Sequence, residues 1–214
     1  MYCDTNKDSL TIANLLALVR KDRSHADDFP YTKEICRCRY CRFCCGGKCA
    51  LKSCCCIAER VKARACTFVE AMNDCFINIS DHVFHYRLRL AAERFKEEKS
   101  CFLSPEHRKR FYDAMNRNRQ KNERYIAQIY ILTATEGIWN AVKPYVTKDG
   151  VLYNSVSFHN MATEDYIYYS TAFDFANNTS HLTLEDLSND EIVDFDIFRV
   201  VCCAITVSVF GREV

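Results

Sequence analysis

Glycine and proline are scarce in this chain, which has 5 Gly and 3 Pro among its 214 residues. Together they make up about 4% of the sequence, whereas an average soluble protein contains about 12%. Glycine-rich loops that bind nucleotide phosphates and closely spaced β-turns both depend on these residues. The scarcity therefore argues against a nucleotide-binding fold of that kind and against a turn-dense β protein.

Long hydrophobic stretches are also lacking. The longest apolar run covers 14 residues, 197–210, and includes Arg199, whereas a helix that spans a membrane needs about 18 or more. The chain opens on MYCDTNKDSL, which contains no apolar signal region. We therefore expect no membrane partner, a buried helix at residues 197–210 and a location in the bacterial cytoplasm, where thiols stay reduced.

Hydrophobic residues recur at three- and four-residue steps along most of the chain, a spacing that is typical of helices with one buried face. Capping and first-turn residues mark several helix starts. We expect helices that begin near Ser9, at residues 57–75, after Ser80 or Asp81, at Ser104-Pro105-Glu106, over 125–132, around 138–142, at a Thr163 cap and over 190–210. Residues 145–160 are expected to form a loop with a short hairpin at 151–153. The predicted fold class is mainly α.

Cysteine is the residue that the chain has in excess, with 15 in total. Nine of them lie between Cys36 and Cys56, in the run CRCRYCRFCCGGKCALKSCCC. Disulfide scaffolds are usually small secreted chains whose cysteines are spread along the sequence. Cysteines that are bunched within a long chain instead predict a metal site, here a Cys-rich zinc-binding knuckle inserted near the N-terminus of a helical protein.

The spacing of these cysteines suits a tetrahedral metal site. Two thiolates with two residues between them can bind one ion from a tight turn, and cysteines from residue 44 onward can complete the set of four ligands. The candidate ligands are Cys38, Cys41, Cys44, Cys45, Cys49 and Cys54. The simplest single site combines Cys38 and Cys41 with two of the other four, although nine cysteines could also hold two ions that share bridging thiolates.

We expect the metal to be structural zinc, because a site with four thiolates has no open position for a reacting water. An iron–sulfur cluster is the main alternative, but the fourth cysteine of the ferredoxin pattern arrives one residue late and lacks the following proline. The stretch CRYCRFCC also resembles the metal-binding core of small bacterial zinc- or iron-chelating proteins. That resemblance supports metal binding and says little about the role of the metal.

The remaining candidate ligands have simpler interpretations. His82 and His85 could bind a metal from one helix face, but we favour ordinary side chains at a helix start. Free cysteine on an apolar helix face behaves as a small core residue, and this describes Cys66, Cys75, Cys202 and Cys203. Cys101 precedes a helix start and has no assigned role.

The net charge of +1 conceals a strong asymmetry along the chain. Residues 1–124 contain 25 Lys and Arg against 16 Asp and Glu, a net charge of +9, while residues 125–214 contain 4 against 12, a net charge of −8. Such a split indicates a basic face and an acidic face with different partners, or two halves that attract each other. A merely solvated acidic surface is the alternative. We place a domain boundary near the change, with a basic domain at 1–100 and an acidic helical domain at 101–214.

The sequence contains none of the common catalytic motifs, such as a Walker A loop, HExxH or GxSxG, and we expect no enzyme. The basic half could bind nucleic-acid phosphates. The acidic half, which carries Tyr166, Tyr168 and Tyr169, better suits a basic protein groove whose natural ligand is nucleic acid. Tyrosine is common in interfaces, although packing in a core is its commoner use.

Two segments carry a family resemblance. Cys101–Met115 (CFLSPEHRKRFYDAM) and Tyr130–Val146 (YILTATEGIWNAVKPYV) are similar to short proteins of phages and mobile elements. The whole layout, a cysteine–metal module followed by a helical part, resembles the metal-binding anti-CRISPR proteins that inhibit type II CRISPR nucleases. The resemblance implies a non-enzymatic inhibitor that binds the nuclease and blocks target-DNA loading or cleavage. The alternative is a zinc-dependent nucleic-acid-binding or regulatory protein of a mobile element.

Overall fold

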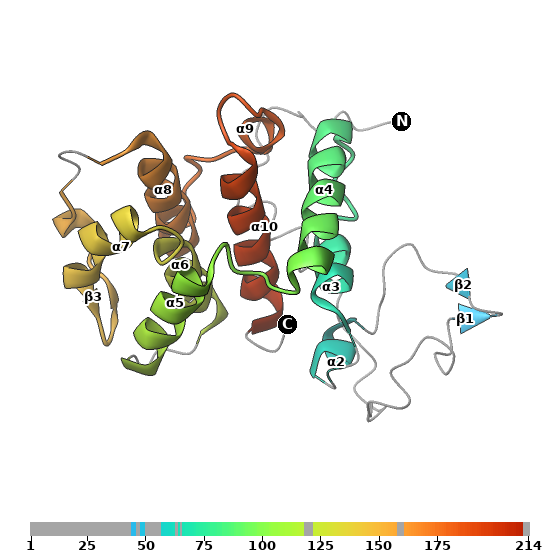
Figure 1. Cartoon of the computed structure of the whole chain (residues 1–214), viewed down its shortest axis with the longest axis horizontal. Coiled ribbons are helices and arrows are strands. Elements are labelled where there is room, and N and C mark those ends of the chain that lie inside the picture. Colours follow the sequence, from blue (N-terminus) through green and yellow to red (C-terminus); the bar gives the residue numbers. More distant parts are fainter. Residues whose placement is uncertain are drawn as a thin grey trace.

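The computed structural model describes residues 44–45, 48–49, 57–62, 64, 66–117, 122–157 and 161–211, and this part of the chain is mainly α-helical, as the sequence predicts (Figure 1). The α-helices are α2 (Ile57–Lys62), α3 (Phe68–Cys75), α4 (His82–Glu98), α5 (Pro105–Arg117), α6 (Glu123–Leu132), α7 (Glu136–Val142), α8 (Thr163–Asn177), α9 (Leu184–Ser188) and α10 (Phe195–Phe210). Two antiparallel hairpins join β1 (Cys44–Cys45) to β2 (Lys48–Cys49) and β3 (Val146–Thr147) to β4 (Gly150–Val151). Among the described residues, none of the helices combines the length and the hydrophobicity that crossing a membrane requires. The helix expected near Ser9 lies outside the described residues.

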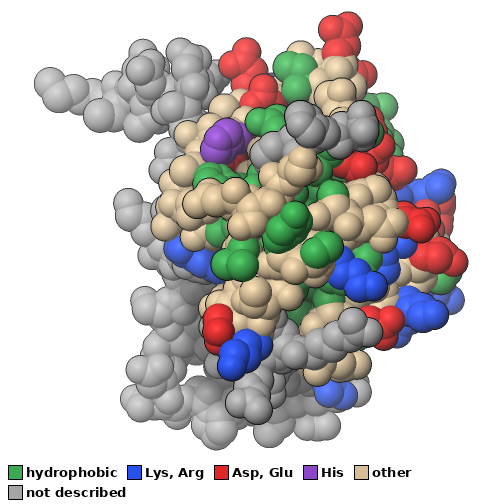
Figure 2. Space-filling model, turned by 90° about the vertical axis from the view of Figure 1, so that its left-hand side faces the viewer, with side chains coloured by type: hydrophobic (Ala, Val, Ile, Leu, Met, Phe, Trp, Pro, Cys, Tyr) green, Lys and Arg blue, Asp and Glu red, His purple; other side chains and the backbone are tan. Residues whose placement is uncertain are grey.

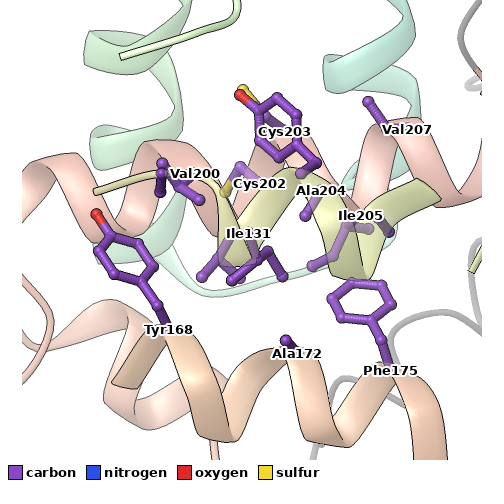
Figure 3. Packing of buried hydrophobic residues seen from close by; sticks show 14 of the residues in the cluster. Ile131, Tyr168, Ala172, Phe175, Val200, Cys202, Cys203, Ala204, Ile205 and Val207 are labelled. Atoms are coloured by element: carbon purple, nitrogen blue, oxygen red, sulfur yellow. The ribbon is translucent and has the colours of Figure 1, made fainter. Parts of the chain in front are cut away.

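Helix α10 is the centre of the helical body. Every residue from Ile197 to Ser208 is buried, and the helix contacts α3, α4, α6 and α8. Figure 1 shows α10 between α3 and α4 on one side and the group formed by α5 to α8 on the other. In Figure 3, Val200, Ala204 and Ile205 of α10 meet side chains of α6 and α8.

The described helices on both sides of residue 100 share one hydrophobic core. Met72 and Phe84 belong to the same cluster of buried residues as Ile131, Phe175 and Val200. The domain boundary near residue 100 stays a prediction, because the shared cluster concerns only the described residues.

Two helix starts that the sequence predicts are confirmed by their caps. The Asp81 carboxylate accepts a hydrogen bond from the Phe84 backbone N–H at 2.7 Å and caps α4. The Ser104 hydroxyl accepts one from the His107 N–H at 3.1 Å, directly before the proline that opens α5. Such caps satisfy N–H groups that have no partner within the helix.

Residues 57–75 form two helices, and the expectation of one continuous pattern is wrong. Arg64, between the two helices, adopts a positive φ of 53° that no helix interior allows. Thr67 and Glu70 then form a reciprocal capping box that opens α3. The break also removes Cys66 from a helix face, since it lies before α3 and its thiol donates a hydrogen bond to the Thr67 carbonyl at 3.3 Å.

The last helix begins later than the sequence suggests. It starts at Phe195 instead of Asp190, because the Asp194 carboxylate caps it through the Ile197 N–H at 2.8 Å. The Thr183 and Asp186 capping box opens the short helix α9, which the hydrophobic pattern did not reveal.

Two smaller expectations also need correction. Thr163 is the first residue of α8 and provides no side-chain cap, since Ala162 occupies the cap position. The expected hairpin exists but lies at residues 146–151, and Tyr153 opens a short 3-10 helix, η4 (Tyr153–Ser155).

A buried histidine joins the start of α5 to the end of α6. His107 is fully buried, and its Nδ1 accepts a hydrogen bond from the Leu103 N–H at 3.2 Å. Its Nε2 lies 2.9 Å from the Tyr130 carbonyl oxygen and must donate there, because a carbonyl only accepts. Burial lowers the pKa of His107 to about 3, so the ring is neutral at physiological pH.

This histidine predicts a pH-dependent stability. In the unfolded chain the histidine pKa is about 6.5, so as the pH falls the unfolded state takes up a proton before the folded state does. The contribution of His107 to the free energy of unfolding is therefore fully present above that pH and is lost as the pH falls towards 3. We expect the free energy of unfolding to fall by about 2 kcal/mol from pH 7 to pH 5 through this group. In urea titrations, the free energy of unfolding of His107→Gln should therefore fall less between the two pH values than that of the wild type, by this same amount. An equal loss in both proteins would contradict the assignment.

Candidate functional site

Three of the six candidate metal ligands lie in the first hairpin. Cys44 and Cys45 form β1 and Cys49 lies in β2, and the antiparallel register pairs Cys44 with Cys49 and Cys45 with Lys48. The other three candidates, Cys38, Cys41 and Cys54, lie outside the described residues. The metal set therefore stays a prediction.

The backbone of this hairpin and the chemistry of its residues fit a zinc ion. Paired α-carbons of an antiparallel ladder are roughly 4.5 to 5.5 Å apart, and two thiolates on one zinc ion are about 4 Å apart given a Zn–S bond near 2.3 Å. Thiolate sulfur is also a ligand type that zinc prefers. The backbones of Cys44 and Cys49, paired across the hairpin, are therefore close enough for both residues to bind one ion.

Within the described ranges, no group of three or more His, Cys, Asp or Glu residues is arranged to hold a metal. His82 and His85 both lie in the first turn of α4. The Nε2 atom of His85 is 2.6 Å from the Ile79 carbonyl oxygen. This contact favours the interpretation of the pair as helix-start side chains.

The cysteines of the helical core are buried or partly buried, and this lowers their reactivity. Cys75, Cys202 and Cys203 are buried in the hydrophobic cluster, as the sequence predicts. Burial raises the pKa of Cys202 and of Cys203 well above that of an ordinary thiol, and it raises the pKa of the partly buried Cys101 to about 11. The thiols of Cys101, Cys202 and Cys203 therefore stay protonated at neutral pH and are poor ligands and nucleophiles.

Many acidic residues of the C-terminal part have a structural role that the sequence did not reveal. Of the 12 Asp and Glu residues after position 124, seven occupy the cap or first turn of a described helix. They are Glu136, Glu164, Asp165, Glu185, Asp186, Asp194 and Asp196. Negative charge is favourable there because the helix N-terminus carries a partial positive charge.

An eighth acidic residue, Asp174, is buried and organises a loop. Its carboxylate accepts hydrogen bonds from the backbone N–H groups of His181 and Leu182 at 2.8 and 3.1 Å. It also accepts one from the Thr179 hydroxyl at 2.7 Å. This carboxylate is therefore committed to the turn after α8 and unavailable to a partner.

The acidic charge nevertheless remains largely on the surface. Six carboxylates on α8 and α9 and around the start of α10 belong to exposed residues: Glu164, Glu185, Asp190, Glu191, Asp194 and Asp196. Arg199 lies in the same part of the chain but is only 4% exposed and pairs with Glu98 at 2.5 Å.

Acidic residues at the starts of α8 and α10 interact with one another. Glu164, in the first turn of α8, interacts electrostatically with Asp194 and Asp196 at the start of α10. Partial burial, together with these negative charges, raises the pKa of the Glu164 carboxyl above its ordinary value. Tyr168 lies one helical turn further along α8 and is fully buried.

The three tyrosines of α8 have different environments. Tyr169 is buried and its hydroxyl donates to the Tyr153 carbonyl at 2.7 Å, whereas Tyr166 is 49% exposed. Tyr168 is fully buried, and its side chain interacts with that of Glu164, one turn earlier in the same helix. Spacing alone could not distinguish these roles, because neighbouring positions differ in which element packs against them.

The cationic residues of α5 are divided between the surface and the core. Arg108 and Lys109 are exposed on α5, and the Arg108 guanidinium lies 5.9 Å from the ring centre of the exposed Tyr112. Arg110 instead donates hydrogen bonds to the carbonyls of Thr133 and Ala134 at 2.9 and 2.8 Å, which closes the end of α6. The described basic surface on α5 is therefore small.

Figure 2 shows the side of the molecule that lies on the left in Figure 1, where α7 and the β3–β4 hairpin are found. Acidic and basic side chains are interspersed there with hydrophobic ones. Among the described side chains of that face, the acidic ones gather mainly towards the top and right, and the basic ones lie at the right edge and in the lower half.

Comparison of the chain with protein families, with curated proteins and with solved structures finds no match.

The metal prediction can be tested by elemental analysis of the purified protein. We expect about one, and at most two, zinc ions per chain, since four thiolates complete a structural site. Cys38→Ser and Cys41→Ser should lower the zinc content, the solubility and the melting temperature. Cys66→Ser, which changes a half-buried cysteine outside the candidate set, is the matched control and should keep the zinc. A metal-free protein of unchanged stability would contradict the structural site.

Proposed function

We propose that this protein is a non-enzymatic inhibitor of the anti-CRISPR type, which binds a type II RNA-guided nuclease and blocks target-DNA loading or cleavage. In this proposal zinc is structural and holds the cysteine module together. The proposal is supported by the resemblance in layout and in the segments Cys101–Met115 and Tyr130–Val146.

The observation that carries the proposal is the exposed acidic charge of the C-terminal helices. Six exposed acidic residues lie on or beside α8, α9 and α10. The described cations after residue 124 are Lys143, Lys148 and Arg199, and the last of these is buried. A surface of this kind repels nucleic acid and attracts a basic protein groove.

A type II nuclease offers such a groove, because it holds its guide–target duplex in a positively charged channel. Electrostatic complementarity between an acidic inhibitor and this channel raises the rate of encounter and disfavours wrong partners. An inhibitor that occupies the channel excludes the nucleic acid without chemistry of its own.

A zinc-dependent nucleic-acid-binding or regulatory protein is the second candidate function. It is favoured by the exposed Arg108, which lies beside the exposed ring of Tyr112, and by the exposed Lys109 next to it in the sequence. Cationic and aromatic side chains together contact phosphates and stack on unpaired bases.

A cleavage assay with a panel of purified type II nucleases tests the first proposal. We expect at least one nuclease to lose about 90% or more of its activity at a small molar excess of this protein, as tight occupation of the channel requires. Addition before the target DNA should inhibit, and addition after the DNA is bound should inhibit less. Undiminished cleavage by every nuclease would contradict the proposal.

Heparin chromatography and DNA binding at several salt concentrations provide the control. The second function predicts retention on both and an affinity that falls steeply with salt. The first function predicts co-elution with a nuclease on a sizing column when no DNA is present.

A further inference from the structure

An exposed tyrosine on α5 is held in place by two phenylalanines of the core. Tyr112 is 43% exposed. Its ring centre lies 5.3 Å from that of Phe111, in an edge-to-face arrangement, and 6.0 Å from that of Phe102. Both phenylalanines are buried. A ring that is already held against the core loses little conformational freedom when a ligand stacks on its exposed part.

Cationic and amide side chains continue the exposed stripe of α5 that contains this ring. Residues three and four positions apart are neighbours on a helix, so Arg108, Lys109 and Asn116 border the ring of Tyr112 along the helix surface. All of these residues are exposed. The Arg108 guanidinium lies 5.9 Å from the ring centre, close to the outer limit of about 6 Å for a cation–π contact. A contact this long holds the guanidinium weakly, so it can turn towards a phosphate.

The acidic residues of α5 lie beside this stripe and leave Arg108 uncompensated. Glu106 and Asp113 are both exposed, but at 3.6 residues per turn they lie about 140 to 160° around the helix from Arg108. Within the described ranges, no carboxylate forms an ion pair with Arg108 or Lys109. Residues 108–124 contain seven Lys and Arg against two Asp and Glu, a net charge of +5. This part of the chain therefore attracts a polyanion.

A similar pair on α4 shows what distinguishes the stripe on α5. Tyr86 is 54% exposed, and the Arg89 guanidinium lies 5.3 Å from its ring centre. The exposed Glu93 follows Arg89 by four positions and therefore shares its helix face. A carboxylate next to the arginine disfavours a phosphate at that place. Figure 1 shows α4 and α5 on opposite sides of α10, so the two pairs can be tested separately.

We propose that α5 binds an unpaired strand of nucleic acid through the exposed stripe of Arg108, Lys109, Tyr112 and Asn116. The tyrosine ring stacks on a base, and the two cations pair with the phosphates beside it. The Asn116 amide donates to a phosphate or base oxygen. The strand must be unpaired, because a splayed base exposes the face on which an aromatic ring stacks. The inference rests on the second candidate function and deepens it, since it names the contact residues and the form of the nucleic acid.

Fluorescence anisotropy with labelled strands of about 15 nucleotides tests this site, since that length fills a typical single-strand groove. The probes are oligothymidine DNA, oligouridine RNA and a DNA duplex of the same length. Tyr112→Leu removes the aromatic ring and keeps an apolar cover over the phenylalanines, and Arg108→Gln removes one cation. Tyr86→Leu and Arg89→Gln make the same changes on α4 and are the matched controls.

We expect Tyr112→Leu to raise the Kd for the single strands by about tenfold, because a stacked base is lost. Arg108→Gln should raise the Kd by about threefold at low salt and make the slope of log Kd against log salt shallower by about 0.7, as for one phosphate contact. Both controls should bind as the wild type does, and the duplex should bind more weakly than either single strand. Oligothymidine and oligouridine show whether the site prefers DNA or RNA.

Three results would overturn the site: a wild-type protein that binds no single strand, an unchanged Kd in Tyr112→Leu, or equal weakening in Tyr86→Leu. Tyr112→Trp keeps the test decisive if the leucine variant does not fold. A larger aromatic ring should bind single strands at least as tightly as the wild type, and loss of binding by a folded Tyr112→Trp protein would contradict stacking at this position.

The same proteins separate this inference from the proposed functions. Retention on heparin that falls steeply with salt, together with one Kd for the wild type and Tyr112→Leu, supports the second candidate function and contradicts the site. Inhibition of a nuclease without any binding of single strands supports the first function and contradicts the site. Single-strand binding that depends on Tyr112, without inhibition of any nuclease, supports the site and contradicts the first function.

Discussion

The complete burial of α10 is the constraint on which the described structure depends. A helix whose residues 197–208 are all buried must be covered on every side, and α3, α4, α6 and α8 provide that cover. The hydroxyls of Thr206 and Ser208 are satisfied within the helix, since they donate to the Cys202 and Ile205 carbonyls at 2.9 and 2.7 Å. Helices from the basic and the acidic parts of the chain are thereby held in one hydrophobic cluster.

The same arrangement gives the acidic residues two roles. Asp194 and Asp196 stabilise the start of α10 as a cap and a first-turn charge, and Glu164 does the same for α8. Because the starts of these two helices lie close together, charges that are favourable within each helix accumulate at one place. The acidity that the sequence shows is therefore a consequence of capping and, in our proposal, the means of attracting a basic partner.

Local signals in the sequence predict where helices begin better than they predict which residues of different helices contact one another. The Asp81 and Ser104 caps act within one turn, so their residues are adjacent in the sequence. Arg87 donates hydrogen bonds to the carbonyls of Leu187 and Val193, about 100 positions away, and no local pattern reveals such a partner. The electrostatic interaction of Glu164 with Asp194 and Asp196 likewise depends on how α8 meets α10. The cysteine spacing, in contrast, suggests a metal site without any knowledge of the fold.

Hydrogen–deuterium exchange, with and without the guide-free nuclease, tests the central claim that an α10-centred core presents the starts of α8 and α10 to a basic partner. The account predicts that amides of residues 197–208 exchange slowest, only through global unfolding, and that the nuclease adds protection at residues 163–168 and 194–196. Faster exchange in α10 than in the helices that cover it, or added protection confined to α5, would contradict the account.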